Sequence, residues 1–363
     1  MKATETSAYR ILVINPGSTS TKVAVYDNET PLFSENAVHS QQALDTCGSD
    51  LTAQLPLRMQ VMNRMLKEYA VDPATISAVV GRGGMIPGLK TGGYYADNQL
   101  CRTVMQGALI PHASNLGALM AKEAAEPLGI PAFIYDAVSA ADLPEIATVT
   151  GIPEIRRQSY CHVLNSRAMA REYARQQGRR YEELRLLVAH LGGGISVSAH
   201  AGGQIIDVIT DDGGPFSPER AGSVPLLYII DMCFSGAYTK EEVVRKQRGR
   251  GGLAALLGTS DCREIERRIQ DGDEYAQKMY QAQAYQIAKG IGELTPTLCG
   301  RIDAVILTGG LAWSKKMTGM ISEYVKAIAP VVVMPGEKEM EALALGALRL
   351  LRGQEEARRY EVC

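Results

Sequence analysis

A hydroxyl-rich turn near the start of the chain has the composition of a phosphate-binding loop. The segment ILVINPGSTSTKVAVYD places two strand-like runs, residues 10–14 and 23–26, on either side of a small polar stretch. Backbone N–H groups and short hydroxyl side chains in such a turn can surround phosphate oxygens. The candidates are Gly17, Ser18, Thr19, Ser20 and Thr21, flanked by Asn15 and Lys22. The alternative is an ordinary hairpin turn rich in serine and threonine.

Two glycine clusters follow later strand-like runs. The segment VAHLGGGISVSAH carries His190 just before Gly192, Gly193 and Gly194, and AVILTGGLAWS carries Gly309 and Gly310 between a strand and a helix. Glycine lets the backbone approach a ligand closely, and a nucleotide could lie over the second cluster. Each cluster alone also fits a flexible hairpin or a plain connection. The three turns together favour a nucleotide site.

Charged residues near strand ends supply candidates for charge neutralisation. Arg82 in VVGRGGMIPG and Arg220 in PFSPERAGS could each hold a carboxylate or a phosphate. Asp136 ends the apolar run PAFIYD, where a carboxylate could hold Mg²⁺ or orient the arginines. The alternatives are a solvated arginine at 82, a loop ion pair between Glu219 and Arg220, and a simple capping role for Asp136.

The elements that must position these residues predict an α/β protein with two related halves. Strand-like runs at 184–191, 195–200 and 204–209 repeat the layout of the first turn, and residues 303–307 and 330–334 form further strands. Helical patterns cover residues 57–69, 115–126, 165–177, 274–294, 313–328 and 340–351. Alternation of strands and helices favours the α/β class. The boundary between the halves is expected near residues 151–153.

Composition excludes several classes of protein. The 363 residues are 46% hydrophobic and 21% charged, with a formal net charge of −2, which fits about two globular domains and provides no overall basic field for nucleic acid or membrane. No apolar run reaches the roughly 18 residues of a membrane span. The seven scattered cysteines never form a C-x-x-C pair and are expected to be reduced. With a polar start and no leader pattern, the expected location is the cytoplasm.

The motifs NPGSTSTK, HLGGG, LTGGLAWS and PGEKEMEALALG, taken together, resemble the acetokinase family of the actin, sugar kinase and Hsp70 superfamily. The resemblance covers nearly the whole chain. Acetate kinases usually carry HLGNG and are longer, whereas GRGGMIPG, FSPERAGSVP and PGEKEM look like the butyrate branch. The resemblance implies two RNase H-like domains with an active-site cleft between them. The expected limits are 1–152, rejoined by 340–363, and 153–339 for the nucleotide-binding domain.

The resemblance also implies roles for single residues. His162 in SYCHVLN resembles the family histidine that contacts the transferring phosphoryl group, although a core histidine is the alternative. Glu339 in PGEKEM matches the metal-associated glutamate, with Glu337 as competitor, and either could merely favour a helix N-terminus. The expected Mg²⁺ residues are Asn15, Asp136 and Glu339. The expected catalytic residues are Arg82, Asp136, His162 and Arg220. The residues expected to bind ATP or ADP are Asn15, Ser18, Ser20, Lys22, His190, Gly192, Gly193, Gly194, Gly309 and Gly310.

The expected activity is therefore reversible phosphorylation of a short-chain carboxylate by ATP with Mg²⁺. Butanoate is the expected acid, with isobutyrate, propionate or acetate as alternatives. A carboxylate is already ionised at neutral pH, so the barrier lies in bringing two anions together rather than in removing a proton. An Hsp70-like ATPase switch is the alternative from another class. The expected partner is a second copy of the chain, in a dimer or larger assembly, and a helix start capped by Ser114 or Asn115 is expected at HASN.

Overall fold

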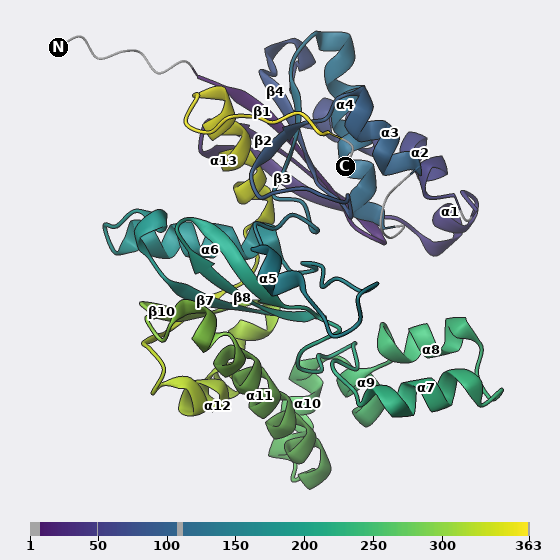
Figure 1. Ribbon diagram of the computed structural model, residues 1–363. Coiled ribbons are helices and arrows are strands. Elements are labelled where there is room, and N and C mark those ends of the chain that lie inside the picture. Colours follow the sequence, from purple (N-terminus) through teal and green to yellow (C-terminus); the bar gives the residue numbers. More distant parts are fainter. Residues whose placement is uncertain (1–7, 49, 107–111, 362–363) are drawn as a thin grey trace. The chain divides into compact units, whose positions relative to one another are not determined.

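The computed structural model describes residues 8–48, 50–106 and 112–361 (Figure 1). The polar N-terminal residues 1–7, on which the expectation of no leader rests, lie outside this range. The chain divides into two compact units, Met1–Ala141 with Lys338–Cys363, and Asp142–Glu337. This division falls at 141 and 338, whereas the sequence analysis placed the domain limits at 152 and 340. The domain limits from sequence stay a prediction.

The first unit is built on a six-stranded mixed sheet with the order β3-β2-β1-β4-β6-β5. Its strands are β1 (Arg10–Pro16), β2 (Ser20–Asp27), β3 (Thr30–Val38), β4 (Ala78–Arg82), β5 (Gly93–Tyr95) and β6 (Ala132–Tyr135). The strands β1, β2 and β3 form an antiparallel meander, and β4 and β6 extend it in parallel. The central strands are buried on both faces, so they are continuous apolar runs such as ILVI and AVV.

Helices cover both faces of this sheet. They are α1 (Gln41–Asp45), α2 (Leu55–Glu68), α3 (Asn98–Gln106), α4 (Leu116–Ala125) and α13 (Glu339–Leu351). On one face, Leu12, Val23 and Phe33 pack with apolar residues of α2 and α4. On the other face lies α13, which returns from the far end of the sequence (Figure 1). The sequence therefore closes this unit with its last helix.

The second unit repeats the same plan. Its sheet has the order β11-β10-β7-β8-β9, with β7 (Leu186–Leu191), β8 (Ile195–Ala201), β9 (Gln204–Ile209), β10 (Ala304–Gly309) and β11 (Val331–Pro335). Three antiparallel strands are again followed by two parallel ones. The shared order confirms the prediction of two related halves and the α/β fold class.

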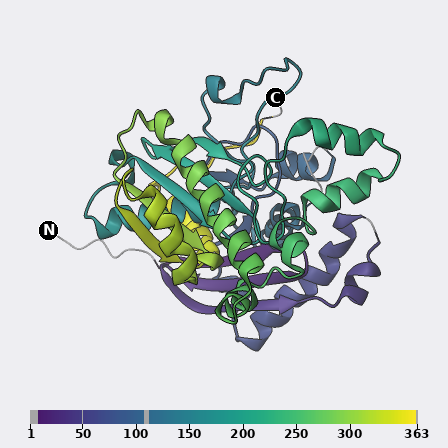
Figure 2. The same ribbon diagram turned by 90° about the horizontal axis from the view of Figure 1, so that it is seen from below.

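Most helices of the second unit cover the two faces of its sheet, whereas α7 and α8 form a pair that projects away from the sheet (Figure 1). The helices are α5 (Glu145–Thr148), α6 (Val163–Gln176), α7 (Leu226–Phe234), α8 (Lys240–Gln247), α9 (Gly252–Leu257), α10 (Cys262–Gln270), α11 (Glu274–Glu293) and α12 (Lys315–Val325). Apolar side chains of α6 pack on one face of the sheet. Those of α9 to α12 pack on the other, where Figure 2 shows α11, in green, running across the strands.

Several local expectations needed correction. The first turn is shorter than residues 15–22, because the antiparallel pairing of β1 with β2 continues to Pro16–Thr21 and leaves only residues 17–20 between the paired positions. The helix start expected at HASN is confirmed, since Asn115 is the N-cap residue of α4, but its side chain makes no capping hydrogen bond. The His112 side chain instead accepts from Ser114 N at the start of the preceding 3-10 turn. Among the described residues, no helix has both the length and the apolar character to cross a membrane.

Candidate active site

The carboxyl ends of three adjacent strands bring Asn15, Arg82 and Asp136 together in the first unit. In β1 and β4, Ile14 pairs with Gly81, so Asn15 and Arg82 follow at the same level. Arg82 in turn pairs with Tyr135 of β6, and Asp136 is the next residue. Parallel strands present their last residues along one edge of a sheet, which is where ligands of open α/β sheets bind. Residues far apart in sequence thus form one polar group.

The first turn of α13 adds a carboxylate to this group. Asn15 Nδ2 donates to Glu339 Oε2 at 2.8 Å, and the Arg82 guanidinium forms an ion pair with the same carboxylate. The Arg82 side chain is only 11% exposed, and its buried Nε has no hydrogen-bond partner within the described part of the chain. A buried guanidinium N–H without a partner is costly in a folded protein. The arrangement therefore favours binding of an anion at Arg82.

Asp136 is held in an unusual backbone conformation. It is buried, its φ is +43°, and its Oδ1 accepts from Gly92 N at 2.7 Å. Non-glycine residues seldom take positive φ, and such strain is concentrated at functional positions. Together with the oxygens of Asn15 and Glu339, its carboxylate gives the hard oxygen donors that Mg²⁺ prefers. Asn15, Asp136 and Glu339 therefore carry the type of donor that the ion assigned to them in the sequence analysis requires.

The hydroxyl-rich turn lies beside the polar residues at the strand ends, and a side chain of α2 holds its backbone. Gly17 N donates to Ser20 O at 2.8 Å, and Asn15 pairs across the strands with Lys22, so both side chains lie on one face of the sheet. Fully buried Arg58 of α2 donates to the carbonyls of Ser18 and Ser20, at 3.3 and 2.8 Å. These hydrogen bonds hold the backbone of the turn, and Ser18 at its tip is exposed.

In the second unit, His190 lies at the carboxyl end of β7, level with Thr308 of β10. Asn165 Nδ2 of α6 lies 3.0 Å from His190 Nδ1 and donates to Thr308 Oγ1 at 3.3 Å. His190 Nε2 is 3.4 Å from Glu337 Oε1. The two competing glutamates are therefore in different surroundings: Glu337 lies beside His190, and Glu339 lies beside Asn15.

His162 stacks on His190. Their ring centroids are 3.7 Å apart and the planes differ by 6°. His162 precedes α6, and its Nδ1 lies 2.8 Å from Ser196 Oγ of β8. The structure thus brings together two histidines that the sequence analysis considered separately.

The triple-glycine turn packs directly against the loop that carries Arg220. Ser217 Oγ donates to Gly193 O, and Glu219 N donates to the same oxygen at 3.3 Å. A Cβ at Gly194 would lie 2.9 Å from Cζ of Arg220, so the absence of a side chain there makes room for the guanidinium. The triple-glycine turn therefore leaves space for the Arg220 side chain, in addition to being a candidate phosphate-binding loop.

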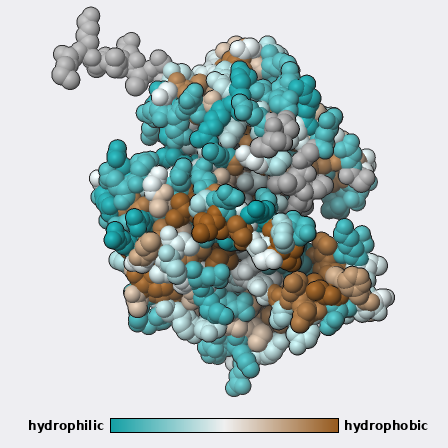
Figure 3. All heavy atoms as spheres, in the orientation of Figure 1, coloured by the Kyte–Doolittle hydropathy of each residue, from teal (hydrophilic) through white to brown (hydrophobic). Residues whose placement is uncertain are grey.

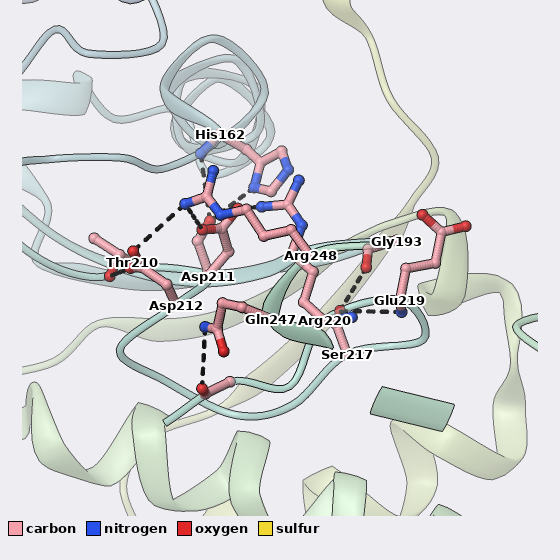
Figure 4. A network of polar contacts seen from close by, with 12 residues as sticks. His162, Gly193, Thr210, Asp211, Asp212, Ser217, Glu219, Arg220, Gln247 and Arg248 are labelled. Carbon is pink, nitrogen blue, oxygen red and sulfur yellow. Dashed lines mark hydrogen bonds and ion pairs between the residues drawn. The ribbon is translucent and has the colours of Figure 1, made fainter. Parts of the chain in front are cut away.

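Asp211, which follows β9, holds two arginines (Figure 4). Its buried carboxylate forms an ion pair with Arg220, and it accepts from Arg248 at 3.1 Å. Arg248 also lies 3.4 Å from Asp212. Arg220 therefore pairs with Asp211, not with the neighbouring Glu219 that the sequence analysis considered.

The charge of Arg220 survives this burial. Desolvation, and after it the cation of Arg248, lower the pKa of Arg220 to about 10. A group with that pKa is almost fully protonated at neutral pH. Arg220 can therefore neutralise a phosphate or carboxylate at physiological pH.

The second glycine cluster requires glycine at its first position. Gly309 has φ +89°, and a Cβ there would lie 2.4 Å from Leu191 O. Its N–H and C=O both bond to Gly336. A Cβ at Gly310, by contrast, would meet no atom within 4 Å. Gly309 thus fixes the close approach of β7 and β10, while Gly310 leaves the adjacent backbone open.

Sequence reasoning missed the residues that hold the candidates in place: Arg58, Asn165, Asp211 and Arg248. One signal was available, since Arg58 interrupts an otherwise apolar helix face of methionines and leucines. Asn165 contacts His190, 25 positions away, and Arg248 contacts Asp211, 37 positions away, so neither contact can be read from a local pattern. Asn165 ends the segment SYCHVLN, but only His162 of that segment was singled out. The predicted site residues fall into two groups, one in each unit.

Comparisons with known proteins agree on one family. A family model described as "Acetokinase family" matches residues 148–326. The protein "Probable butyrate kinase" of Clostridium botulinum (strain Alaska E43 / Type E3) is 44% identical over 355 residues, covering 97% of this chain and all of the relative. "Probable butyrate kinase 2" of Caldanaerobacter subterraneus is 44% identical over 353 residues, covering 97% and 99%.

Solved structures match the fold. The acetate kinase of Porphyromonas gingivalis superposes with a TM-score of 0.76 at 18% identity, covering 95% of this chain and 100% of that one. The acetate kinase of Entamoeba histolytica gives 0.75 at 16% identity, covering 96% and 99%. At these identities the likeness shows the shared fold alone.

Proposed function

The chain belongs to the acetokinase family, and on this premise we propose that it transfers the γ-phosphoryl group of ATP to the carboxylate of a short-chain fatty acid, butanoate. The products are butanoyl phosphate and ADP, and the reaction is reversible. A carboxylate oxygen forms a bond to the γ-phosphorus while the bond from that phosphorus to the β,γ-bridging oxygen breaks. No proton is removed, so the site needs no general base.

The observation that carries this proposal is the buried guanidinium of Arg82 with its unpartnered Nε. Two anions must meet for the reaction to occur, and fixed positive charge lowers that barrier most effectively in a site shielded from water. Arg82 is placed at a strand end, and its contact with the carboxylate of Glu339 orients the guanidinium. We assign it to the acyl carboxylate and the transferring phosphoryl group.

The remaining candidates divide between phosphate binding and support. Arg220 and His162 hold the transferring group, while His190 and the triple-glycine turn hold the β- and γ-phosphates with Asn15, Ser18, Ser20 and Lys22. Gly309 and Gly310 flank the adenosine. The pairing of Arg220 with Asp211 and its charge at neutral pH support the first assignment.

Mg²⁺ is the metal ion that the first group of residues suits. Asn15, Asp136 and Glu339 would hold it, directly or through water, and it would neutralise part of the phosphate charge. The contact with Arg82 orients the carboxylate of that glutamate. We assign Glu339 rather than Glu337 to the metal because Glu339 contacts Asn15.

We also infer the cellular compartment, the state of assembly and the range of acids. ATP is the phosphoryl donor, and the six cysteines of the described residues form no disulfide, which favours action in the cytoplasm. We infer a homo-oligomer as the working form. Isobutyrate, propionate and acetate stay as alternative acids, since one methylene changes selectivity by only about 1 to 3 kcal/mol.

Phosphorus NMR tests the proposal. Purified protein with ATP, Mg²⁺ and butanoate is expected to produce ADP together with an acyl phosphate resonance, in equal amounts. The same mixture without acid is expected to leave ATP intact. ADP and inorganic phosphate formed at the same rate with and without butanoate would contradict a carboxylate kinase and indicate an ATPase.

A further inference from the structure

A cation with no assigned role lies where the projecting helical pair joins the second unit. Exposed apolar residues of α7 form the brown surface that Figure 3 shows where Figure 1 places this helix. The residue that follows α8 differs in character: the side chain of Arg248 is only 32% exposed and contacts the buried Asp211. The function proposed above uses Arg220, which contacts the same carboxylate, but it gives no part to Arg248.

The backbone holds Arg248 and Arg220 opposite each other. The two residues face one another in a short antiparallel bridge, which the hydrogen bond from Gly249 N to Glu219 O, at 2.8 Å, supports. Side chains directly opposite in an antiparallel pair lie on the same side of it, and like charges in that position repel. The two guanidinium groups are therefore stable together only with an anion between them.

Asp211 supplies that anion. Its side chain is 10% exposed, it pairs with Arg220, and it accepts from Arg248 Nη2 at 3.1 Å. Figure 4 shows both arginine side chains directed at this carboxylate. Arg248 Nη2 also lies 3.4 Å from Asp212, whose side chain is 43% exposed, so water screens that second contact. Two cations around one buried carboxylate leave positive charge for a further anion.

Arg220 is the arginine that faces this further anion. It packs against the triple-glycine turn, a candidate phosphate-binding loop, where a Cβ at Gly194 would meet its guanidinium carbon. Its backbone is fixed, since Arg220 N donates to Ser217 Oγ and Ser217 N donates to Arg220 O, each at 3.0 Å. A change of partner at Arg220 therefore requires only a rotation of the side chain.

We propose that Arg248 is a positioning residue that releases Arg220 to the substrate. When the guanidinium of Arg220 turns from Asp211 to the transferring phosphoryl group, Arg248 stays paired with Asp211. Withdrawing the only partner of a buried carboxylate is strongly unfavourable, because it leaves an uncompensated charge. With Arg248 in place, Asp211 keeps one partner throughout. This inference rests on the function proposed above, in which Arg220 holds the transferring group.

Calorimetric titration with two nucleotides tests this exchange of partners. AMP-PNP, a stable analogue of ATP, carries a γ-phosphate, and ADP does not; each is titrated with Mg²⁺ into the full chain. In Arg248→Met, Arg220 is expected to stay on Asp211 in about nine molecules of ten, so the apparent Kd for AMP-PNP rises about tenfold. The Kd for ADP should stay nearly unchanged, because ADP lacks the group that Arg220 binds.

The Asp211→Asn, Arg248→Met double variant separates this exchange from a merely structural role. Without a negative charge at position 211, Arg220 has no ion pair to break, so the double variant should regain most of the roughly tenfold loss in AMP-PNP affinity. A merely structural Arg248 predicts the opposite, since the losses of the two substitutions would add. Arg248→Lys should also retain most of the affinity, because a single nitrogen of Arg248 makes both of its contacts.

Asp211→Asn alone keeps both arginines and tests the exchange even if Arg248→Met does not fold. It should bind AMP-PNP at least as tightly as wild type, because Arg220 is no longer held by an ion pair. Its kcat should nevertheless fall, since Arg220 loses the contact that orients it before the substrate arrives. Weaker binding of AMP-PNP by Asp211→Asn would contradict the exchange.

Arg250→Met is the matched control. Arg250 is exposed, lies two positions after Arg248, and contacts neither Asp211 nor Asp212 within the described part of the chain. Its affinity for AMP-PNP should equal that of wild type. Unchanged AMP-PNP affinity in Arg248→Met, equal losses for AMP-PNP and ADP, or a double variant weaker than Arg248→Met would overturn the proposal. If no sample makes acyl phosphate, the proposed function fails, while the two nucleotide affinities still decide the role of Arg248.

Discussion

At the scale of single residues, the account depends on fixed positive charge. Arg82 is held by Glu339 in a buried position, and Arg220 is held by Asp211 over a glycine. Arg82 is not the solvated surface residue that was its alternative, and Arg220 pairs with Asp211 rather than with Glu219, which was its alternative. Their ionised partners determine where the guanidinium groups lie before any substrate arrives, and such preorganisation is a major source of catalytic rate.

Arg82→Ala is expected to lower kcat by about 100- to 1,000-fold, because it removes a donor from the developing negative charge. ATP affinity, measured by calorimetry, should stay nearly unchanged. Arg263→Ala is the control, since the Arg263 side chain is 92% exposed and its ion pair with Asp261 is a surface contact. Turnover of Arg82→Ala equal to that of the control would remove Arg82 from the mechanism.

Gly194→Ala tests whether the position of the Arg220 side chain depends on the absence of a side chain at residue 194. The new methyl group would lie 2.9 Å from Cζ of Arg220 and must displace the guanidinium. We expect kcat to fall by about tenfold to a hundredfold, since a shift of the order of 1 Å has that effect on a positioned group. Gly194 does not have positive φ, so the substitution adds no backbone strain of its own.

Gly292→Ala in α11 is the matched control for that substitution, because a Cβ at Gly292 meets no atom within 4 Å. The control should keep full activity. Equal activity of the two alanine variants would mean that Arg220 either is not displaced or does not act on the substrate.

At the scale of elements, the buried His200 of β8 and its hydrogen-bond partners make the free energy of unfolding depend on pH. His200 is fully buried, with Tyr181 Oη 2.7 Å from its Nδ1 and Ser198 Oγ 2.8 Å from its Nε2. Burial, and then the charge of Arg167, lower the pKa of His200 to about 3. In the unfolded chain the same imidazole takes up a proton near pH 6.5. Between these values the unfolded state binds more protons, so stability falls as pH falls.

The free energy of unfolding should therefore lose about 1.4 kcal/mol through His200 for each pH unit below about 6.5. Urea unfolding at pH 6.5 and 5.0 measures this loss. His200→Gln keeps a polar side chain but has no titrating group, so its pH dependence should be smaller by that amount. An identical pH dependence in both proteins would show that His200 is protonated in the folded state.

The elements also show how far sequence reasoning reached. The strand of residues 184–191 was predicted within two residues of β7, and the helix of residues 274–294 within one of α11, because their apolar patterns are long and regular. The projecting helix α7 was not predicted. Its apolar residues surround the whole helix, so its sequence lacks the one-sided pattern by which a helix is recognised.

At the scale of the whole molecule, each unit repeats one strand order and contributes one group of polar residues. Motifs revealed the glycine turns and His190, since these are continuous segments. The positioning roles of Asn165, Asp211 and Arg58 were not predicted, because they depend on contacts with His190, Arg248 and Ser20, which lie 25, 37 and 38 positions away. The pairing of Asn15 with Glu339, 324 positions apart, likewise needed the return of α13.

The most direct test of carboxylate phosphorylation is a hydroxylamine-trapping assay with ATP, Mg²⁺ and straight and branched acids from acetate to valerate. Acyl phosphates react with hydroxylamine to form coloured hydroxamates, so the product itself is measured. The account predicts hydroxamate formation with a maximum at butanoate. Absence of hydroxamate with every acid, while ATP is still hydrolysed, would contradict it.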